Sequence, residues 1–248
     1  MLSKHLIKIL LFLPLVAIFS CQTGHSPEGF AISGKIPSHS GQKVRLKEMD
    51  PKEILNLDSV TADASGNFTL NEKVKEAGFY ILQFGTGKEL LLSMEPGEKL
   101  EISGKLENIP EGIQVSGSAG TMLLKEFYNL SNRNKIKVDS LKAILHGAEG
   151  TPDFYKLSIS ADSAFQKINN DQKALEKDFI DKHHESLASL IVLNFALGAT
   201  PVLSMDEDLD YYQKLTALSA RYPGNKHVVF HQQRVTVFID NKSKPKFH

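Results

Sequence analysis

The segment 79-FYILQFGTGKELLLSM-94 contains two largely apolar runs, Phe79–Phe84 and Leu90–Met94, separated by the turn residues Gly85-Thr86-Gly87. Apolar runs of five or six residues that are bounded by turn residues are typical of strands buried on both faces. A short Gly-containing connection between two such runs is typical of a β-hairpin. We therefore interpret this segment as a hairpin whose strands are covered on both sides.

Shorter runs on both sides of this hairpin alternate between apolar and polar residues. The alternating apolar positions are Phe30, Ile32 and Ile36; Val44 and Leu46; Leu55 and Leu57; Phe68 and Leu70; Leu100 and Ile102; and Ile113 and Val115. About eight short strands with turn signals every 8–12 residues indicate an antiparallel β-sandwich or barrel. The spacing leaves no room for crossover helices, so we expect no parallel sheet over residues 30–117.

The hydrophobic period changes after Gly117, and residues 118–248 read as an all-α helical domain of about five helices. The segments with helical periodicity are 122–130, 141–145, a long helix that starts near Pro152, Leu187–Leu197 ending at Gly198, a helix from Asp206 towards Tyr222, and a last helix that Asn225 caps and that runs through Phe238. Apolar residues that recur every three or four positions predict amphipathic helices. The expected fold class is therefore α+β, with the sandwich and the helices segregated along the chain.

Composition excludes several classes of function. The chain has 248 residues, of which 41% are hydrophobic, with 29 basic and 29 acidic side chains and a formal net charge of +0. A neutral chain lacks the excess of positive charge that nucleic-acid binding requires, so we expect no nucleic-acid partner. A single cysteine excludes a disulfide scaffold, a zinc ribbon and intramolecular dithiol chemistry.

The N-terminal segment is typical of a targeting signal. Lys4 and Lys8 precede the apolar run Ile9–Phe19, which at about 11 residues is too short to span the ~30 Å core of a bilayer and fits a secretory signal. Ile18-Phe19-Ser20-Cys21 resembles a bacterial lipobox, whose cysteine is lipidated. We expect residues 1–20 to be a lipoprotein signal peptide, Cys21 to carry an acyl anchor to the membrane, and residues 21–29 to be a polar tether.

The order of the motifs resembles a β-rich domain of unknown function, with a helical segment after it, at the front of Bacteroidetes-type lipoproteins. The residues that carry the resemblance are Phe30-x-Ile32-x-Gly34-x-Ile36, Leu57-Asp58-Ser59-Val60, Gly66-x-Phe68, Glu95-Pro96-Gly97-Glu98, Val115-x-Gly117-Ser118, Asp178-Phe179-Ile180 and Tyr222-Pro223. The resemblance implies a lipid-anchored protein of the outer membrane, more on its periplasmic face than on the cell surface.

In many members of that family a thioredoxin-like domain of the thiol–disulfide oxidoreductase type follows. Such enzymes act through a Cys-x-x-Cys pair. This chain has no cysteine after residue 21, so the resemblance assigns a catalytic role to none of its residues. We interpret the protein as the accessory half standing alone, or as a member that lost its enzyme domain.

Few other residues in the sequence suggest a metal site or a site of modification. His227 and His231 are four residues apart on the expected last helix, a spacing that allows zinc binding from one face, but no third ligand is evident. We expect them to be surface histidines of an amphipathic helix, and we expect neither a metal site nor a cofactor. Ser59, Ser140 and Ser163 each lie in a short Asp-Ser motif that resembles the acceptor of periplasmic O-glycosylation in the same bacteria.

Three hypotheses for the function remain. The first is a non-catalytic, lipid-anchored envelope protein that acts as a binding or accessory module or forms a homodimer. The second is a subunit that works in trans with a separate thioredoxin-like protein, or the truncated front half of such an oxidoreductase. The third, from fold analogy alone, is a carbohydrate- or ligand-binding lipoprotein.

Overall fold

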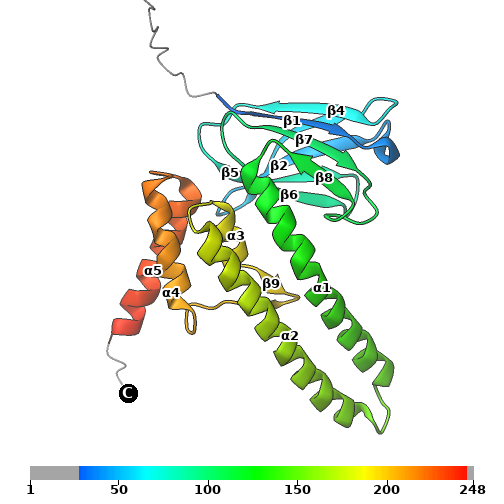
Figure 1. Cartoon of the computed structure of the whole chain (residues 1–248), viewed down its shortest axis with the longest axis vertical. Helices are drawn as coiled ribbons and strands as arrows, with labels where there is room; N and C mark the ends of the chain where they lie inside the picture. The colour runs from blue at the N-terminus through cyan, green and yellow to red at the C-terminus, as the bar shows by residue number, and fades with distance from the viewer. Residues whose placement is uncertain (1–27, 245–248) are drawn as a thin grey trace, which may run out of the picture.

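The structure is a computed structural model that describes residues 28–244, and it shows a β-sandwich followed by helices (Figure 1). The strands of the sandwich are β1 (Phe30–Lys35), β2 (Lys43–Met49), β3 (Ile54–Thr61), β4 (Asn67–Glu72), β5 (Gly78–Phe84), β6 (Glu89–Met94), β7 (Lys99–Gly104) and β8 (Ile113–Ser116). Each strand coincides with a segment that was predicted to be a strand, either from alternating apolar and polar residues or from a continuous apolar run. Cys21, the expected signal peptide and most of the expected tether lie outside the described residues.

The eight strands form two four-stranded sheets packed face to face, and no barrel closes. The first sheet has the order β4-β1-β7-β8 and the second the order β3-β2-β5-β6. The core between them holds apolar residues of the alternating runs, such as Ile32, Leu46, Leu70 and Leu100, which are almost completely buried. The run Leu55 and Leu57 on β3 is the exception, because both side chains are exposed. The predicted α+β class is confirmed, and of the two β architectures expected, the structure adopts the sandwich.

The expectation of a purely antiparallel arrangement is wrong at one pair of strands. β1 and β7 run parallel, with Ile32 opposite Leu100 and Gly34 opposite Ile102. The connection between them passes through β2 and β3 of the second sheet, β4 of the first sheet, and β5 and β6 of the second, so strands take the place of the crossover helix that parallel neighbours usually need. Loop spacing alone does not reveal such a crossover.

The helical half consists, within residues 28–244, of α1 (Ala119–Ala148), α2 (Phe154–His183), α3 (Ala188–Leu193), α4 (Leu209–Lys214) and α5 (Lys226–Ser243), with a 3-10 helix at Leu215–Ala220. Figure 1 shows α1 and α2 as a long antiparallel hairpin that extends away from the sandwich. Asn225 caps α5 as predicted, because its side chain accepts hydrogen bonds from the N–H groups of His227 and Val228. α5 extends beyond Phe238, where the sequence pattern ended it.

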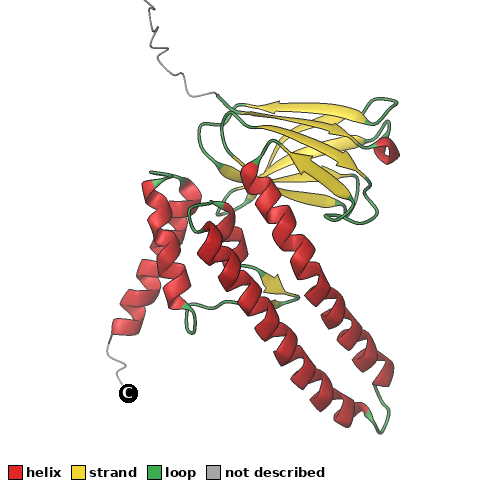
Figure 2. Cartoon of the chain, in the orientation of Figure 1, coloured by secondary structure: helices red, strands yellow, loops and turns green. Residues whose placement is uncertain are grey.

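The expectation of an all-α second half is wrong at residues 196–201. The helix expected to reach Leu197 ends at Leu193, and a small hairpin follows, β9 (Ala196–Leu197) paired with β10 (Thr200–Pro201), visible among the helices in Figure 2. Gly198 has φ +73°, a conformation that favours glycine and suits a two-residue hairpin turn. The glycine that sequence analysis took for a helix stop is therefore part of the turn of this hairpin.

A second core joins the two halves. The outer face of the second sheet, through Phe79 and Ala77, packs against α1, α2, α3 and α5, through residues such as Phe127, Phe179, Leu190 and Val228. A smaller cluster of Val138, Ile168, Leu197 and Val202 holds the β9–β10 hairpin on α1 and α2. Among the described residues no helix has both the length and the apolar character needed to cross a bilayer.

Candidate functional site

A cleft lies where the β7–β8 loop, helix α1 and the β9–β10 hairpin meet. It has a volume of ≈ 510 Å³. Its lining residues are Ile109, Pro110, Tyr128, Ser131, Asn132, Lys135, Val138, Asp139, Phe195, Ala196, Leu197 and Gly198. We call it the junction cleft, because three separate parts of the chain build it.

Aromatic side chains form part of its wall. The ring of Phe195 lies 5.8 Å from that of Tyr128 and 5.1 Å from that of Phe127, both in edge-to-face geometry. Such pairs add to the stabilisation that comes from burying the rings. Burial raises the pKa of Tyr128, so its phenol stays neutral at physiological pH. The rings are thus a fixed apolar surface.

The β7–β8 loop contributes another part of the lining and is hydrogen-bonded to α1. The Glu111 side chain accepts a hydrogen bond from the Asn132 amide on α1. Inside the loop, the Lys105 N–H donates to the Gly112 carbonyl at 2.9 Å. These bonds place Ile109 and Pro110 beside the aromatic wall.

The charged groups at the rim compensate one another. Lys135 donates to Asp139 one turn further along α1 at 2.5 Å, and this hydrogen bond holds the pKa of Asp139 below its ordinary value. Both side chains are well exposed. The rim therefore carries a neutral pair rather than a field of one sign.

A buried polar chain leads from the cleft into the α1–α2 hairpin. Gln172 donates from Nε2 to Ser131 Oγ at 3.0 Å and to Glu176 Oε1 at 3.1 Å, while its Oε1 accepts from Asn134 Nδ2 at 3.1 Å. Glu176 is fully buried, and burial, reinforced by the nearby Asp208 carboxylate, raises its pKa to about 8. Its Oε2 has no partner among the described residues.

Asp208 lies near Glu176, but its pKa is shifted in the opposite direction. It is also buried, and burial alone would raise its pKa, but Lys177 at 2.8 Å and Lys173 at 2.9 Å outweigh that effect and hold the pKa below its ordinary value. Two lysines thus neutralise one buried carboxylate, while Glu176 stays protonated at neutral pH. Asp208 directly precedes α4, so its ion pairs with Lys173 and Lys177 connect α2 to the start of α4.

The lining of the junction cleft can contact a ligand, but none of its residues is arranged as an activated nucleophile. Ser131 accepts its hydrogen bond from an amide, which takes up no proton, so no general base activates its hydroxyl. The carboxylates at the rim, Asp139 and Glu111, are already paired with Lys135 and Asn132. Within residues 28–244 no group of three or more His, Cys, Asp or Glu side chains is placed to hold a metal ion.

The two histidines predicted at the surface are buried instead. His231 donates from Nε2 to the Tyr212 carbonyl at 2.8 Å, and the His227 ring packs 4.7 Å from the Phe79 ring. Burial lowers the pKa of both, that of His227 to about 4. The surface interpretation is wrong because this face of α5, with Val228 and Val235, packs against the sheet and the neighbouring helices. The two histidines have separate partners.

The serines proposed as glycosylation sites do not line the cleft and lie on three different elements. Ser59 is exposed on β3, Ser140 on α1 and Ser163 on α2. Ser140 donates its hydroxyl to the Ile136 carbonyl at 2.9 Å. Their modification stays a prediction, which the intact mass of the mature protein tests.

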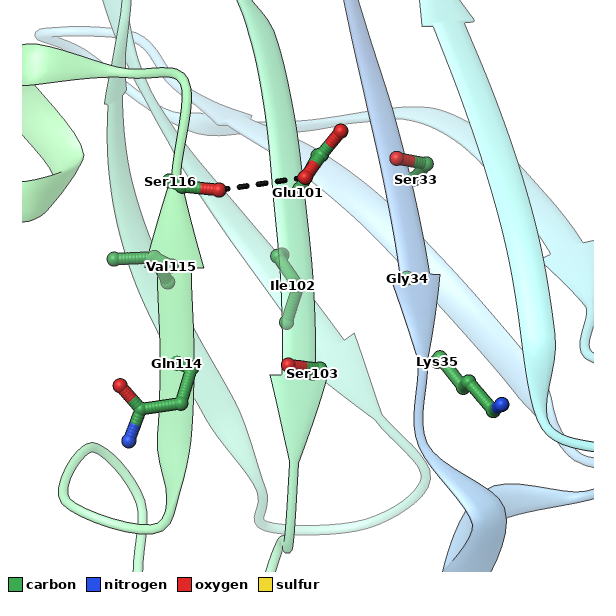
Figure 3. A pocket seen from close by; sticks show the side chains of 9 residues that line it. All are labelled: Ser33, Gly34, Lys35, Glu101, Ile102, Ser103, Gln114, Val115 and Ser116. Carbon is green, nitrogen blue, oxygen red and sulfur yellow. Dashed lines mark hydrogen bonds between the residues drawn. The ribbon is translucent and has the colours of Figure 1, made fainter.

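A second hollow crosses the outer face of the first sheet (Figure 3). Its lining residues are Ser33, Gly34, Lys35, Glu101, Ile102, Ser103, Gln114, Val115 and Ser116. Ser116 donates to Glu101 at the long distance of 3.5 Å. None of the nine residues is aromatic, so the groove offers polar groups without the stacking surface that sugar rings favour.

No sequence motif singled out the residues of the junction cleft. One signal was present: Ser131 and Asn134 share the buried face of α1 with Phe127 and Val138, as Gln172 and Glu176 share that of α2 with Ile168 and Phe179. Polar residues on an apolar helical face need buried partners. Only the fold pairs the two sets.

Residues 30–124 match a protein-family model described as a domain of unknown function (DUF4369). The match covers the sandwich and the first turns of α1, and it confirms the expected resemblance of this part to a domain of unknown function. Comparison with curated proteins gives no match. Most of the junction cleft, from Tyr128 to Gly198, lies outside the matched residues.

Proposed function

We propose that this protein is a non-catalytic, lipid-anchored protein of the bacterial cell envelope that acts as a binding or accessory module. The observation that carries the proposal is the junction cleft. Ligand clefts commonly have volumes of about 300–1,000 Å³, lie where domains meet, and combine an apolar lining with a few polar groups. The junction cleft has each of these properties.

Its construction supports a preformed site. Phe195 and Tyr128 are locked in an aromatic cluster, Glu111 is bonded to Asn132, and Ser131 is held from behind by Gln172. A partner that enters this cleft meets groups already in place, so little conformational freedom is lost on binding. The absence of an activated nucleophile among the lining residues fits binding rather than turnover.

The proposed anchor agrees with the position of the cleft. An acylated Cys21 is separated from the first described residue by six residues, so the two lie at most about 25 Å apart. The described chain begins at the sandwich, and the tip of the α1–α2 hairpin lies at the far end of the molecule (Figure 1). Anchoring at the outer membrane, with the protein on its periplasmic face, would leave the helical half free to meet a partner.

Photo-cross-linking in living cells tests the proposal. Replacing Tyr128 with p-benzoylphenylalanine puts a photoreactive ring in the cleft, and the same replacement at Lys135 puts one at its exposed rim. Tyr155 is the matched control, because it is a tyrosine on α2 that is 76% exposed and outside the cleft. We expect one discrete adduct from the two cleft positions and none from residue 155.

The mass of the adduct also distinguishes the partner hypotheses. An adduct with a thioredoxin-like protein would favour a role in trans in thiol–disulfide exchange, and an adduct of twice the protein's own mass would favour a homodimer. No adduct at either cleft position, or the same products at residue 155, would contradict the proposal.

A further inference from the structure

We propose that the partner of the junction cleft is an extended peptide segment that adds a strand to the free edge of β9; this inference rests on the proposed binding function. The Val202 N–H donates to the Phe195 carbonyl at 3.2 Å, so these two residues form a hydrogen-bonded pair of the hairpin. In antiparallel ladders hydrogen-bonded and non-hydrogen-bonded pairs alternate. The next pair, Ala196 with Pro201, is therefore of the second kind.

This alternation directs the N–H and C=O groups of Ala196 away from β10. Pro201 has no N–H, so it donates no hydrogen bond to Ala196. Ala196 is exposed and lines the junction cleft. The cleft thus presents one backbone donor and one backbone acceptor from the same residue, a pattern that the backbone of an added strand matches.

The walls of the cleft suit side chains that alternate along such a strand. Phe195, Tyr128, Ile109 and Pro110 all contribute to the lining, so a strand along β9 would direct apolar side chains towards apolar groups of the cleft. The stretch Phe195–Gly198 that lines the cleft spans at most about 10 Å at 3.3 Å per step, which fits three or four residues of peptide.

The rim indicates the charge of the segment. Lys135 and Asp139 form an ion pair with each other, and Glu111 accepts a hydrogen bond from the neutral Asn132 amide. Burying an unmatched charge against the aromatic wall would be costly. We therefore expect a segment of uncharged residues with an apolar residue at every second position.

Selection from a random twelve-residue peptide library displayed on phage, with the full mature protein as bait, tests the inference. We expect the enriched sequences to show alternating apolar residues. A synthetic enriched peptide should slow hydrogen exchange of the Ala196 amide at least tenfold, because strand pairing places that N–H in a hydrogen bond. It should also shift the NMR signals of residues 195–198.

Two changes separate strand pairing from simple apolar contact. Ala196→Pro removes the edge N–H, and we expect it to weaken the peptide's Kd at least tenfold, whereas Ala196→Ser keeps the N–H and should change Kd less than threefold. The second change leaves the protein intact: methylating the backbone nitrogens of the peptide that face β9 should abolish binding, while methylation at the intervening nitrogens should not.

Peptides that tolerate both sets of methylation, or that bind Ala196→Pro as tightly as the unchanged protein, would overturn the inference. So would a cleft that takes up a small apolar dye but enriches no peptide. In either case an adduct at Tyr128 in the cross-linking experiment would still uphold the binding function. Failure of both experiments would remove the function and the inference together.

Discussion

Glu176 is the most unusual side chain among the described residues, because it is a fully buried carboxyl group with one oxygen unpartnered. Its other oxygen accepts from Gln172, which in turn donates to Ser131 at the cleft. The free energy of ionising a group in such a site is high, and its pKa of about 8 expresses that cost. At neutral pH the Glu176 carboxyl group is therefore protonated, and the hydrogen-bonded series Glu176, Gln172 and Ser131 carries no charge.

The stability of the protein should therefore depend on pH through Glu176. The pKa is about 8 in the folded chain and near the ordinary 4.5 when unfolded, so between these values the folded state binds the extra proton. Stability from this group is then fully present below pH 4.5 and is lost as pH rises towards 8, by roughly 1 kcal/mol per pH unit. Glu176→Gln, which cannot ionise, should show a smaller decline in the free energy of unfolding from pH 5 to pH 8.

Urea unfolding at several pH values measures this difference. Glu185→Gln is the control, because Glu185 is exposed and should leave the pH dependence unchanged. Parallel pH curves for the unchanged protein and Glu176→Gln would show that Glu176 ionises normally.

At the level of elements, the contact between α1 and β6 fixes where the helical half begins. Ser118 caps α1 by accepting from the Thr121 N–H at 3.3 Å. Ser118 and Thr121 both donate their hydroxyls to the Ser93 carbonyl, at 2.9 and 3.1 Å, and the Ser93 N–H donates back to Thr121 Oγ1. These bonds bring the first turn of the helix against the strand, with Gly120 at the point of closest approach.

Two glycines of the same helix should respond in opposite ways to alanine. A Cβ at residue 120 would lie 2.7 Å from Ser93 Oγ and 2.9 Å from the Ser93 carbonyl oxygen, so Gly120→Ala must push α1 away from β6. We expect it to destabilise the protein by about 1–3 kcal/mol. Nothing lies within 4 Å of a Cβ at residue 147, so Gly147→Ala should stabilise it by about 0.5–1 kcal/mol.

Denaturant midpoints of the two variants, compared with that of the unchanged protein, test both signs in one series. A midpoint for Gly120→Ala at or above that of the unchanged protein would mean that the helix and strand are not packed as closely as described.

Across the whole molecule, the second sheet belongs to two cores at once. Its inner face packs on the first sheet and its outer face on the helices. α5 closes the second core from the far end of the chain, because Asn225 donates to the Ala77 carbonyl at 2.7 Å and Lys226 pairs with Glu48 and Asp50 on the sandwich. Contacts over such sequence distances make the sandwich and the helices interdependent.

The proposed membrane attachment of the whole protein rests on Cys21. Each buried methylene of an acyl chain adds ~0.8 kcal/mol to membrane binding, so several chains give stable anchoring. We expect the unchanged protein to stay in the membrane fraction after an alkaline wash, and Cys21→Ser to move to the soluble fraction. Ser26→Ala, in the same expected tether, should stay with the membrane. Retention of Cys21→Ser in the washed membranes would rule out a lipid anchor at this residue.

Local patterns were enough to locate the eight strands of the sandwich and the main helices, because the period of apolar residues reports which face of most elements is buried; β3, whose Leu55 and Leu57 are exposed, is an exception. The parallel β1–β7 pair, the β9–β10 hairpin and the buried His227 and His231 were beyond such patterns. The sequence likewise did not predict the junction cleft or the buried hydrogen bonds that link Glu176, Gln172 and Ser131, although polar residues on apolar helix faces indicated that buried partners must exist. Each depends on which faces meet across many intervening residues, and that is a property of the packed chain rather than of any local segment.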